Sequence, residues 1–284
     1  MTPRLLFRLF PLLPAILFAL PAFAATGQWA EGEHARMRLV AARPAPGAPF
    51  EAAIELELDP GWKTYWRTPG DAGIPPRFDF SASTNAGGAT IDYPAPERSD
   101  DGFSVSNVYH DRVLLPVRFS LSDPDEPARL VLAADLGVCK DICLPVSLSA
   151  NLDVSPADAE PRAIATLAEA RAALPGPGQT GVFEIEALRQ VGGNEKSPEY
   201  EVEVAAASPD DSLLFVETPS DWYPATPTLA STGKGTATYR FAIDRKTASG
   251  PLAGASIRLT LSSGSAATTR AFTLGSTGAA TATP

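Results

Sequence analysis

Short segments that alternate apolar and polar residues, separated by turns rich in proline and glycine, recur along most of this 284-residue chain. In residues 50–58, the apolar Ile54, Leu56 and Leu58 alternate with two glutamates. This two-residue period is typical of a half-buried β-strand. Asp-Pro-Gly at residues 59–61 then provides a turn. Because such segments are short and closely spaced, the pattern predicts an all-β chain built of antiparallel sandwiches.

The same pattern predicts two groups of further strands, one on each side of a helix. The first group is Met37–Ala42, Lys63–Trp66, Arg77–Phe80, Thr90–Tyr93, Val113–Leu121, Arg129–Leu136 and Val146–Leu152. The second group is Val182–Leu188, Tyr200–Ala205, Leu213–Glu217, Thr236–Ile243, Ile257–Leu261 and Arg270–Leu274. Between the groups, apolar residues at helical spacing precede a Pro-Gly-Pro-Gly stop at 175–178, which indicates a short connecting helix.

These segments predict the domain organisation. We expect a first β-sandwich over residues 25–155, a helical linker over 156–180 and a second β-sandwich over 181–274. The small and polar residues 275–284 favour a disordered tail.

The N-terminus has the features of an export signal. Arg4 and Arg8 precede an apolar run over residues 9–20, and Ala22-Phe23-Ala24 fits a signal peptidase site, so residues 1–24 are predicted to be a signal peptide. No later stretch approaches the length of a membrane span, which predicts an exported, soluble product without stable membrane insertion. The formal net charge of −10 makes nucleic acid an unsuitable partner.

Cys139 and Cys143 are the only cysteines in the chain, and three residues separate them. Strand-like segments lead into and out of the pair, which predicts a hairpin with residues 140–142 as its loop. In such a hairpin the two Cα atoms lie about 5 Å apart, within disulfide range. A ring this small gains little loop-closure entropy, which favours exchange chemistry over a structural staple. The adjacent Lys140 favours a thiolate at Cys139, our preferred nucleophile, although nearby aspartates oppose it.

Two other uses of the cysteine pair stay open from the residues alone. One is a structural disulfide that only braces the loop. The other is metal capture: two thiolates are too few for a closed zinc site, but Cu(I) accepts two soft ligands. We predict no cofactor and no resident metal.

Four segments together resemble a known family. They are Trp62–Pro76, Tyr93–Arg98, Val113–Val117 and Val138–Pro145. In order and spacing they are similar to the N-terminal periplasmic domain of the DsbD/ScsB protein-disulfide reductases, over about residues 30–155. The helix and the second β domain resemble the longer N-terminal region of the ScsB-like branch.

The resemblance implies an immunoglobulin-like sandwich in the periplasm, with Cys139 and Cys143 as its redox-active residues. It also implies a mobile cap loop whose aromatic residue shields the sulfurs. The matching stretch is 99–110, in which Phe103 is the candidate cap, Tyr109 the substitute, and Asp101 a further residue bordering the site.

Aromatic residues after the turn at 59–61 are a second group of candidates. Tyr65 and Trp66 are candidates to border the cysteine site, but core packing is the favoured role, since aromatic residues dominate sandwich cores whether or not a site is near.

We therefore predict a thiol–disulfide exchange protein, similar to a protein-disulfide reductase, whose expected partners are periplasmic thioredoxin-like proteins or a membrane-embedded electron donor. We expect it to lack the family's transmembrane and thioredoxin-like domains, so that a separately encoded donor supplies the electrons. The alternative is a non-catalytic binding module, a copper-stress or folding partner, with a structural disulfide or Cu(I) bound by the reduced pair.

Overall fold

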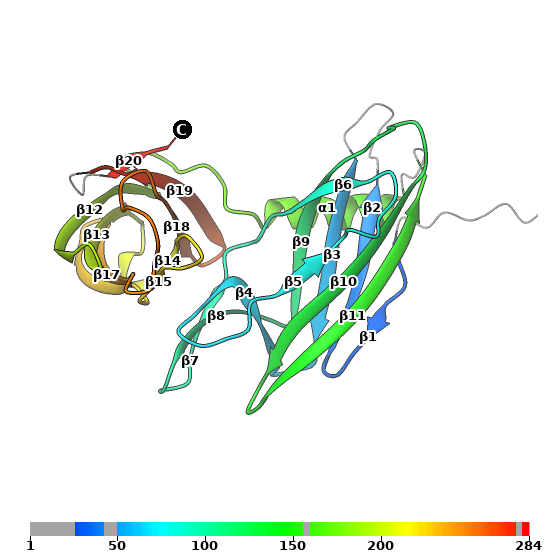
Figure 1. Cartoon of the computed structure of the whole chain (residues 1–284), viewed down its shortest axis with the longest axis horizontal. Coiled ribbons are helices and arrows are strands. Elements are labelled where there is room, and N and C mark those ends of the chain that lie inside the picture. Colours follow the sequence, from blue (N-terminus) through cyan, green and yellow to red (C-terminus); the bar gives the residue numbers. More distant parts are fainter. Residues whose placement is uncertain (1–25, 43–49, 156–159, 277–279, 284) are drawn as a thin grey trace, which may run out of the picture.

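The computed structural model describes residues 26–42, 50–155, 160–276 and 280–283 (Figure 1). The predicted signal peptide lies outside these residues. Sheets and a single α-helix make up the regular structure of the described residues, apart from one short 3-10 turn, η1 (Pro209–Asp211). The predicted all-β class is confirmed.

The first domain is a sandwich of two antiparallel sheets. One sheet has the order β1 (Ala30–Glu31), β2 (Ala35–Ala42), β3 (Glu51–Leu58), β9 (Arg112–Ser120) and β6 (Gly87–Ile91). The other has the order β11 (Cys143–Val154), β10 (Ala128–Cys139), β4 (Lys63–Gly70), β8 (Val105–His110) and β7 (Glu97–Asp100), with β5 (Arg77–Asp79) also paired to β10. Apolar residues of both sheets, such as Ile54 and Leu132, form the core between them. Because apolar and polar residues alternate along the strands, each sheet has an apolar face, and the two apolar faces pack together.

Helix α1 (Pro161–Ala172) covers the outer face of the first sheet. Its buried residues Ala163, Leu167 and Ala170 pack against the β2–β3–β9 surface, including Val40 and Leu114. The predicted helix is therefore present, but it is an integral part of the first domain rather than a free linker.

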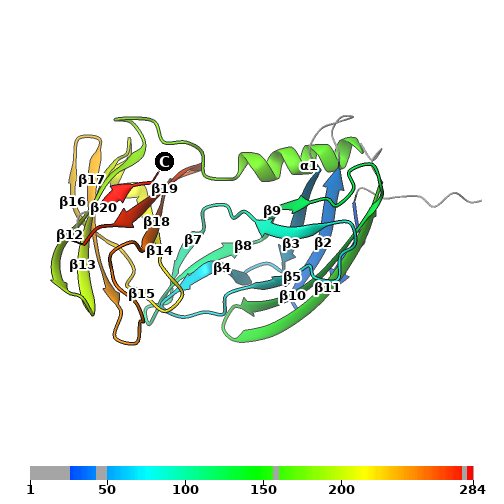
Figure 2. The same ribbon diagram turned by 45° about the horizontal axis from the view of Figure 1, so that its top comes forward.

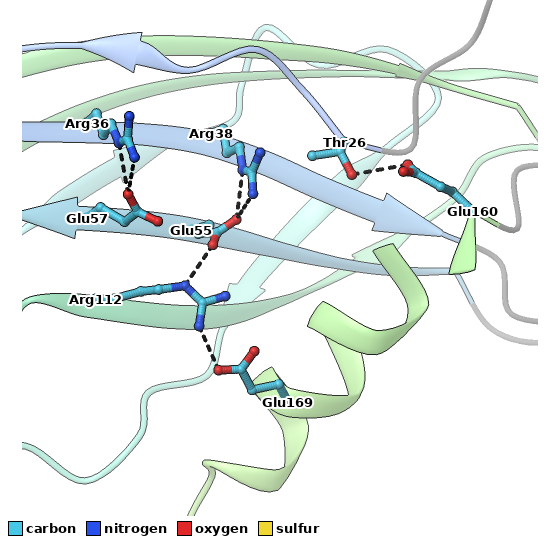
Figure 3. A network of polar contacts seen from close by, with 8 residues as sticks. All are labelled: Thr26, Arg36, Arg38, Glu55, Glu57, Arg112, Glu160 and Glu169. Carbon is cyan, nitrogen blue, oxygen red and sulfur yellow. Dashed lines mark hydrogen bonds and ion pairs between the residues drawn. The ribbon is translucent and has the colours of Figure 1, made fainter. Parts of the chain in front are cut away.

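A polar network also ties this helix to the sheet (Figure 3). Glu55 of β3 accepts hydrogen bonds from Arg38 and Arg112, and Arg112 also pairs with Glu169 of the helix at 2.6 Å. The sequence pattern assigned Glu55 to a solvent-facing side, but the helix covers it and leaves only 2% exposed. Burial alone raises the pKa of Glu55, yet the hydrogen bonds from both arginines outweigh burial and the net pKa lies below its ordinary value.

The second domain also contains two sheets around its own core (Figure 2). One sheet has the order β12 (Glu184–Asn194), β13 (Ser197–Ala205), β17 (Thr236–Asp244) and β15 (Tyr223–Pro224), with β16 (Thr228–Gly233) also paired to β17. The other has the order β14 (Ser212–Glu217), β18 (Ser256–Ser263), β19 (Ala266–Leu274) and β20 (Ala280–Ala282). Apolar side chains from both sheets, among them Val202 and Leu259, are fully buried between them.

Strand β20 corrects part of the predicted tail. Residues 280–282 pair with β19, from Phe272 opposite Ala282 to Leu274 opposite Ala280. The expectation of disorder is therefore wrong for these three residues, because backbone pairing at a sheet edge does not require large side chains.

No helix within the described residues is long and apolar enough to cross a membrane.

Candidate functional site

The two cysteines face each other at the end of a long hairpin. Strands β10 and β11 pair over their full length, with Cys139 opposite Cys143. Residues 140–142 form the loop, in which the Lys140 N–H donates to the Ile142 carbonyl at 3.0 Å. The two sulfurs are bonded and the Cα atoms lie 4.1 Å apart. The predicted hairpin is confirmed.

Solvent reaches the two sulfur-bearing residues very unequally. Cys139 is only 1% exposed and packs in a small cluster with Tyr65 and Val108. Cys143 is exposed. Thiol–disulfide exchange requires direct attack on a sulfur atom, so the greater exposure of the residue favours access to Cys143 over Cys139.

Tyr65 contacts both sulfurs. Its hydroxyl lies 3.2 Å from Cys139 Sγ, to which it donates, and 3.4 Å from Cys143 Sγ. Burial, and secondarily the negative charge of Asp101, raise the pKa of Tyr65. The phenol therefore stays protonated at neutral pH and remains a hydrogen-bond donor to sulfur.

Strand β4 holds Tyr65 in this position. It pairs with β10 so that Thr64 lies opposite Val138, and the Thr64 hydroxyl donates to the Gly137 carbonyl at 2.9 Å in a buried setting. Lys63 lies opposite Cys139 on the same face of the sheet. Sequence reasoning considered Lys140 as the nearby cation and overlooked Lys63. Its position two residues before Tyr65, on the same strand face, was the available signal.

Two glycines allow the close packing around Tyr65. A Cβ atom on Gly73, which has φ of +150°, would lie 2.5 Å from the Tyr65 ring. A Cβ atom on Gly137 would lie 2.9 Å from the Ile74 side chain and 3.2 Å from the same ring. Any larger residue at either position would displace the tyrosine that touches the sulfurs.

Trp66 and Tyr109 lie away from the sulfurs. Trp66 follows Tyr65 in a strand, where successive side chains point to opposite faces, and it packs edge-on against Phe215. Tyr109 is buried, its hydroxyl donates to the Pro94 carbonyl at 2.7 Å, and burial raises its pKa well above the ordinary value. Both residues serve the core in this structure.

The stretch compared with a cap loop is a β-hairpin instead. Strands β7 and β8 enclose a turn at 101–104, in which Asp101 Oδ1 accepts the Phe103 and Ser104 N–H groups at 2.9 and 2.8 Å. The Phe103 side chain is 100% exposed, so it shields neither sulfur in this conformation. Lys63 Nζ donates to Ser99 Oγ at 2.9 Å and links this hairpin to β4, the strand that carries Tyr65.

No group of three or more histidine, cysteine, aspartate or glutamate residues in the described part of the chain is arranged to hold a metal ion.

The sequence of residues 36–152 matches the family model described as "Thiol:disulfide interchange protein DsbD, N-terminal". This segment is therefore similar to the N-terminal domain of DsbD. The match covers most of the first sandwich, including β4, β8 and both cysteines.

A solved structure extends the likeness beyond the DsbD N-terminal domain. The crystal structure of the N-terminal periplasmic domain of ScsB from Proteus mirabilis matches with a TM-score of 0.70 and 19% sequence identity, over 88% of this chain and 98% of that chain. At this identity the likeness concerns the fold, and its coverage includes the second domain. No curated protein matches the sequence significantly.

Proposed function

We propose that this chain is a periplasmic thiol–disulfide exchange protein, which passes electrons between a separate donor and oxidised partner proteins through Cys139 and Cys143. The observation that carries the proposal is the asymmetry of the disulfide. One sulfur belongs to an exposed residue, and the other belongs to a buried residue that accepts a hydrogen bond from Tyr65. This arrangement separates the attacked sulfur from the leaving sulfur.

The exchange then proceeds in two steps. A donor thiolate attacks Cys143 Sγ, a mixed disulfide forms, and Cys139 leaves as a thiolate that receives the Tyr65 hydrogen bond and then a proton. The donor's second thiol attacks the mixed disulfide and releases Cys143 as a thiol. Two electrons and two protons thereby reach the pair, and the donor leaves as a disulfide.

Delivery to an oxidised partner reverses these roles. The Cys143 thiolate attacks the partner's disulfide, and Cys139 then resolves the mixed disulfide, so the partner leaves with two thiols. The sequence favoured Cys139 as the nucleophile on the charge of Lys140. Burial argues for Cys143, because access limits exchange before thiolate character does.

The surroundings of the pair suit a protein partner. Exposed apolar side chains stand on neighbouring loops, with Phe103 fully exposed and Ile142 62% exposed. We propose that docking of a thioredoxin-like protein buries both side chains. In the undocked protein, a cap role for Phe103 would require the 101–104 turn to close over the sulfurs.

Single-cysteine variants test the proposal. Reduced Cys139→Ser is expected to form a persistent mixed disulfide with an oxidised thioredoxin-like protein, because Cys143 attacks and no second thiol resolves the product. Cys143→Ser is the matched control and should trap far less. Equal trapping by both variants would contradict the assigned roles. A parent disulfide that does not exchange in glutathione buffers would overturn the function itself.

A further inference from the structure

Strand β14 of the second domain has apolar cover on both of its faces. Its residues 213–216 are all apolar, a pattern typical of a strand without a solvent-facing side. Leu214 and Val216 belong to the core of the second domain. Phe215 belongs instead to the core of the first domain, and Leu213 packs against that same core. Successive side chains of this one strand therefore contact two different cores.

Phe215 is held by two strands of the sheet that carries the disulfide. Its side chain is 1% exposed, and its ring packs edge to face against Trp66 of β4, with 5.9 Å between the ring centroids. The guanidinium of Arg98, on β7, lies 5.1 Å from the centroid of the Phe215 ring and donates to the Leu214 carbonyl at 2.7 Å. Aromatic pairs in this geometry are favourable beyond the area that they bury.

An ion pair adds a second contact between the same two strands. Arg67 of β4 donates to both carboxylate oxygens of Glu217 of β14, at 2.5 and 2.8 Å. The arginine side chain is 27% exposed and the glutamate side chain 15%. A bidentate pair fixes the orientation of both groups as well as their distance. Strand β4 is thus tied to the second domain at two consecutive residues.

Strand β4 connects these contacts to the disulfide. Trp66 and Arg67 directly follow Tyr65, whose hydroxyl contacts both sulfurs. Neighbouring side chains in a strand point to opposite faces, so Tyr65 faces the sulfurs while Trp66 faces Phe215. A single peptide unit joins Tyr65 and Trp66. Any shift of the strand that moves Trp66 therefore moves Tyr65 as well.

The Tyr65 ring has little room to compensate for such a shift. The backbones of Gly73 and Gly137 lie so close to it that a Cβ atom on either would meet the ring, at 2.5 and 3.2 Å. Hydrogen bonds weaken steeply as distance and angle depart from their preferred values. The position of β4 therefore decides whether the Tyr65 hydroxyl reaches the sulfurs.

We propose that the second domain holds β4 in the position that exchange requires, with Phe215 and Glu217 as positioning residues. They act through Trp66 and Arg67, which lie beside Tyr65 in the sequence. The inference rests on the proposed exchange function, and it gives the second domain a part in that function.

Reduction of the full chain by dithiothreitol tests this role, because dithiothreitol attacks the disulfide without a protein partner. Phe215→Leu stays apolar but loses the ring, and its disulfide is expected to be reduced about threefold more slowly than that of the parent. Glu217→Gln should slow reduction about twofold. Phe241→Leu is the matched control, since Phe241 is buried against Tyr200 within the core of the second domain, and it should be reduced at the parental rate. Freed thiols are alkylated and counted by mass.

Combination with Tyr65→Phe shows whether Phe215 acts through the tyrosine hydroxyl. In the Tyr65→Phe background, Phe215→Leu should slow reduction by no more than about 1.5-fold, because the contact that it disturbs is already absent. A second readout uses reduced proteins that carry Cys143→Ser. There the ultraviolet absorbance of the Cys139 thiolate should appear at a higher pH with Phe215→Leu than without it, and at an unchanged pH with Phe241→Leu.

The outcomes separate this inference from the proposed function. Parental or faster reduction of both Phe215→Leu and Glu217→Gln overturns the inference, and so does a Phe215→Leu effect that adds in full to that of Tyr65→Phe. Equal slowing by Phe241→Leu overturns it as well, because general loosening of the second domain would then explain the rates. If the dithiothreitol rates are as expected but the parent does not exchange with a thioredoxin-like protein, the proposed function fails and the positioning role of the second domain stands.

Discussion

The Tyr65 hydroxyl donates to Cys139 Sγ at 3.2 Å, and in the exchange that we propose this contact favours the buried sulfur as the leaving group. A thiolate is a better leaving group when a hydrogen bond stabilises its charge. The hydroxyl also lies 3.4 Å from Cys143 Sγ, so the same group remains near the reaction throughout exchange.

Tyr65→Phe removes this donor and keeps the ring. The rate of attack on the disulfide by a small thiol is expected to fall about fivefold, since a net hydrogen bond contributes about 1 kcal/mol. The pKa of the Cys139 thiol in the reduced protein should rise. Tyr109→Phe is the control, because its hydroxyl binds the Pro94 carbonyl, away from the sulfurs. A similar loss of rate in both variants would assign the effect to stability alone.

Gly137→Ala tests the tight packing beside the disulfide. The added methyl group would meet Ile74 and the Tyr65 ring, so the free energy of unfolding should fall by about 1–3 kcal/mol and exchange should slow. Gly87→Ala has open space around its Cβ position and serves as the control. Urea unfolding and thiol exchange, measured on both variants, check this prediction. If the exchange rate of a destabilised Gly137→Ala protein is unchanged, the packing around Tyr65 contributes to stability but not to exchange.

Glu55→Gln should weaken the attachment of helix α1. The charged hydrogen bonds from Arg38 and Arg112 would become neutral ones, at an expected cost of about 2 kcal/mol of unfolding free energy. The folded-state pKa of Glu55 is depressed, so its contribution is fully present above the unfolded pKa and is lost as pH falls through the folded pKa. The parent should therefore lose stability below about pH 4.5, and Glu55→Gln should lose less of it. If the unfolding free energies of the parent and of Glu55→Gln fall equally with decreasing pH, this role of Glu55 is contradicted.

Arg67 and Glu217 should be energetically coupled. A double-mutant cycle with Arg67→Ala and Glu217→Ala is expected to give a coupling free energy of about 1 kcal/mol or more in unfolding, because the pair is bidentate and partly buried. The exposed pair Arg240–Glu201 lies within the second domain and provides the comparison, with an expected coupling of about 0.5 kcal/mol or less. Equal coupling energies would show that the Arg67–Glu217 pair stabilises the fold no more than an exposed ion pair does.

Much of the fold followed from alternating residues, and the exceptions have physical causes. Strand β16 is exposed at every residue, so it has no apolar face to produce the pattern on which strand prediction depends. The polar stretch at 99–110 was compared with a loop, yet β7 and β8 form there because β8 pairs with β4. Such pairing is a tertiary effect that local sequence does not reveal.

The candidate site was predicted in part for a similar reason. The hairpin followed from two strand-like segments flanking the cysteines. The sequence proposed both Tyr65 and Trp66 as neighbours of the sulfurs, but adjacent residues in one strand face opposite sides, so only Tyr65 lies there. The unequal burial of Cys139 and Cys143 arises because β4 pairs beside β10, whereas β11, which carries Cys143, is the edge strand of the sheet; sequence spacing does not encode this order.

The attachment of helix α1 decides where this protein can be divided. In a fragment ending at residue 155, Val40 and Leu114 would lose their contact with Leu167 and become exposed to solvent. Glu55 would then lie beside an exposed apolar surface. Exposed apolar surface of this kind promotes aggregation. Any separately expressed redox module must therefore retain the chain through Ala172, even though both cysteines lie well before that point.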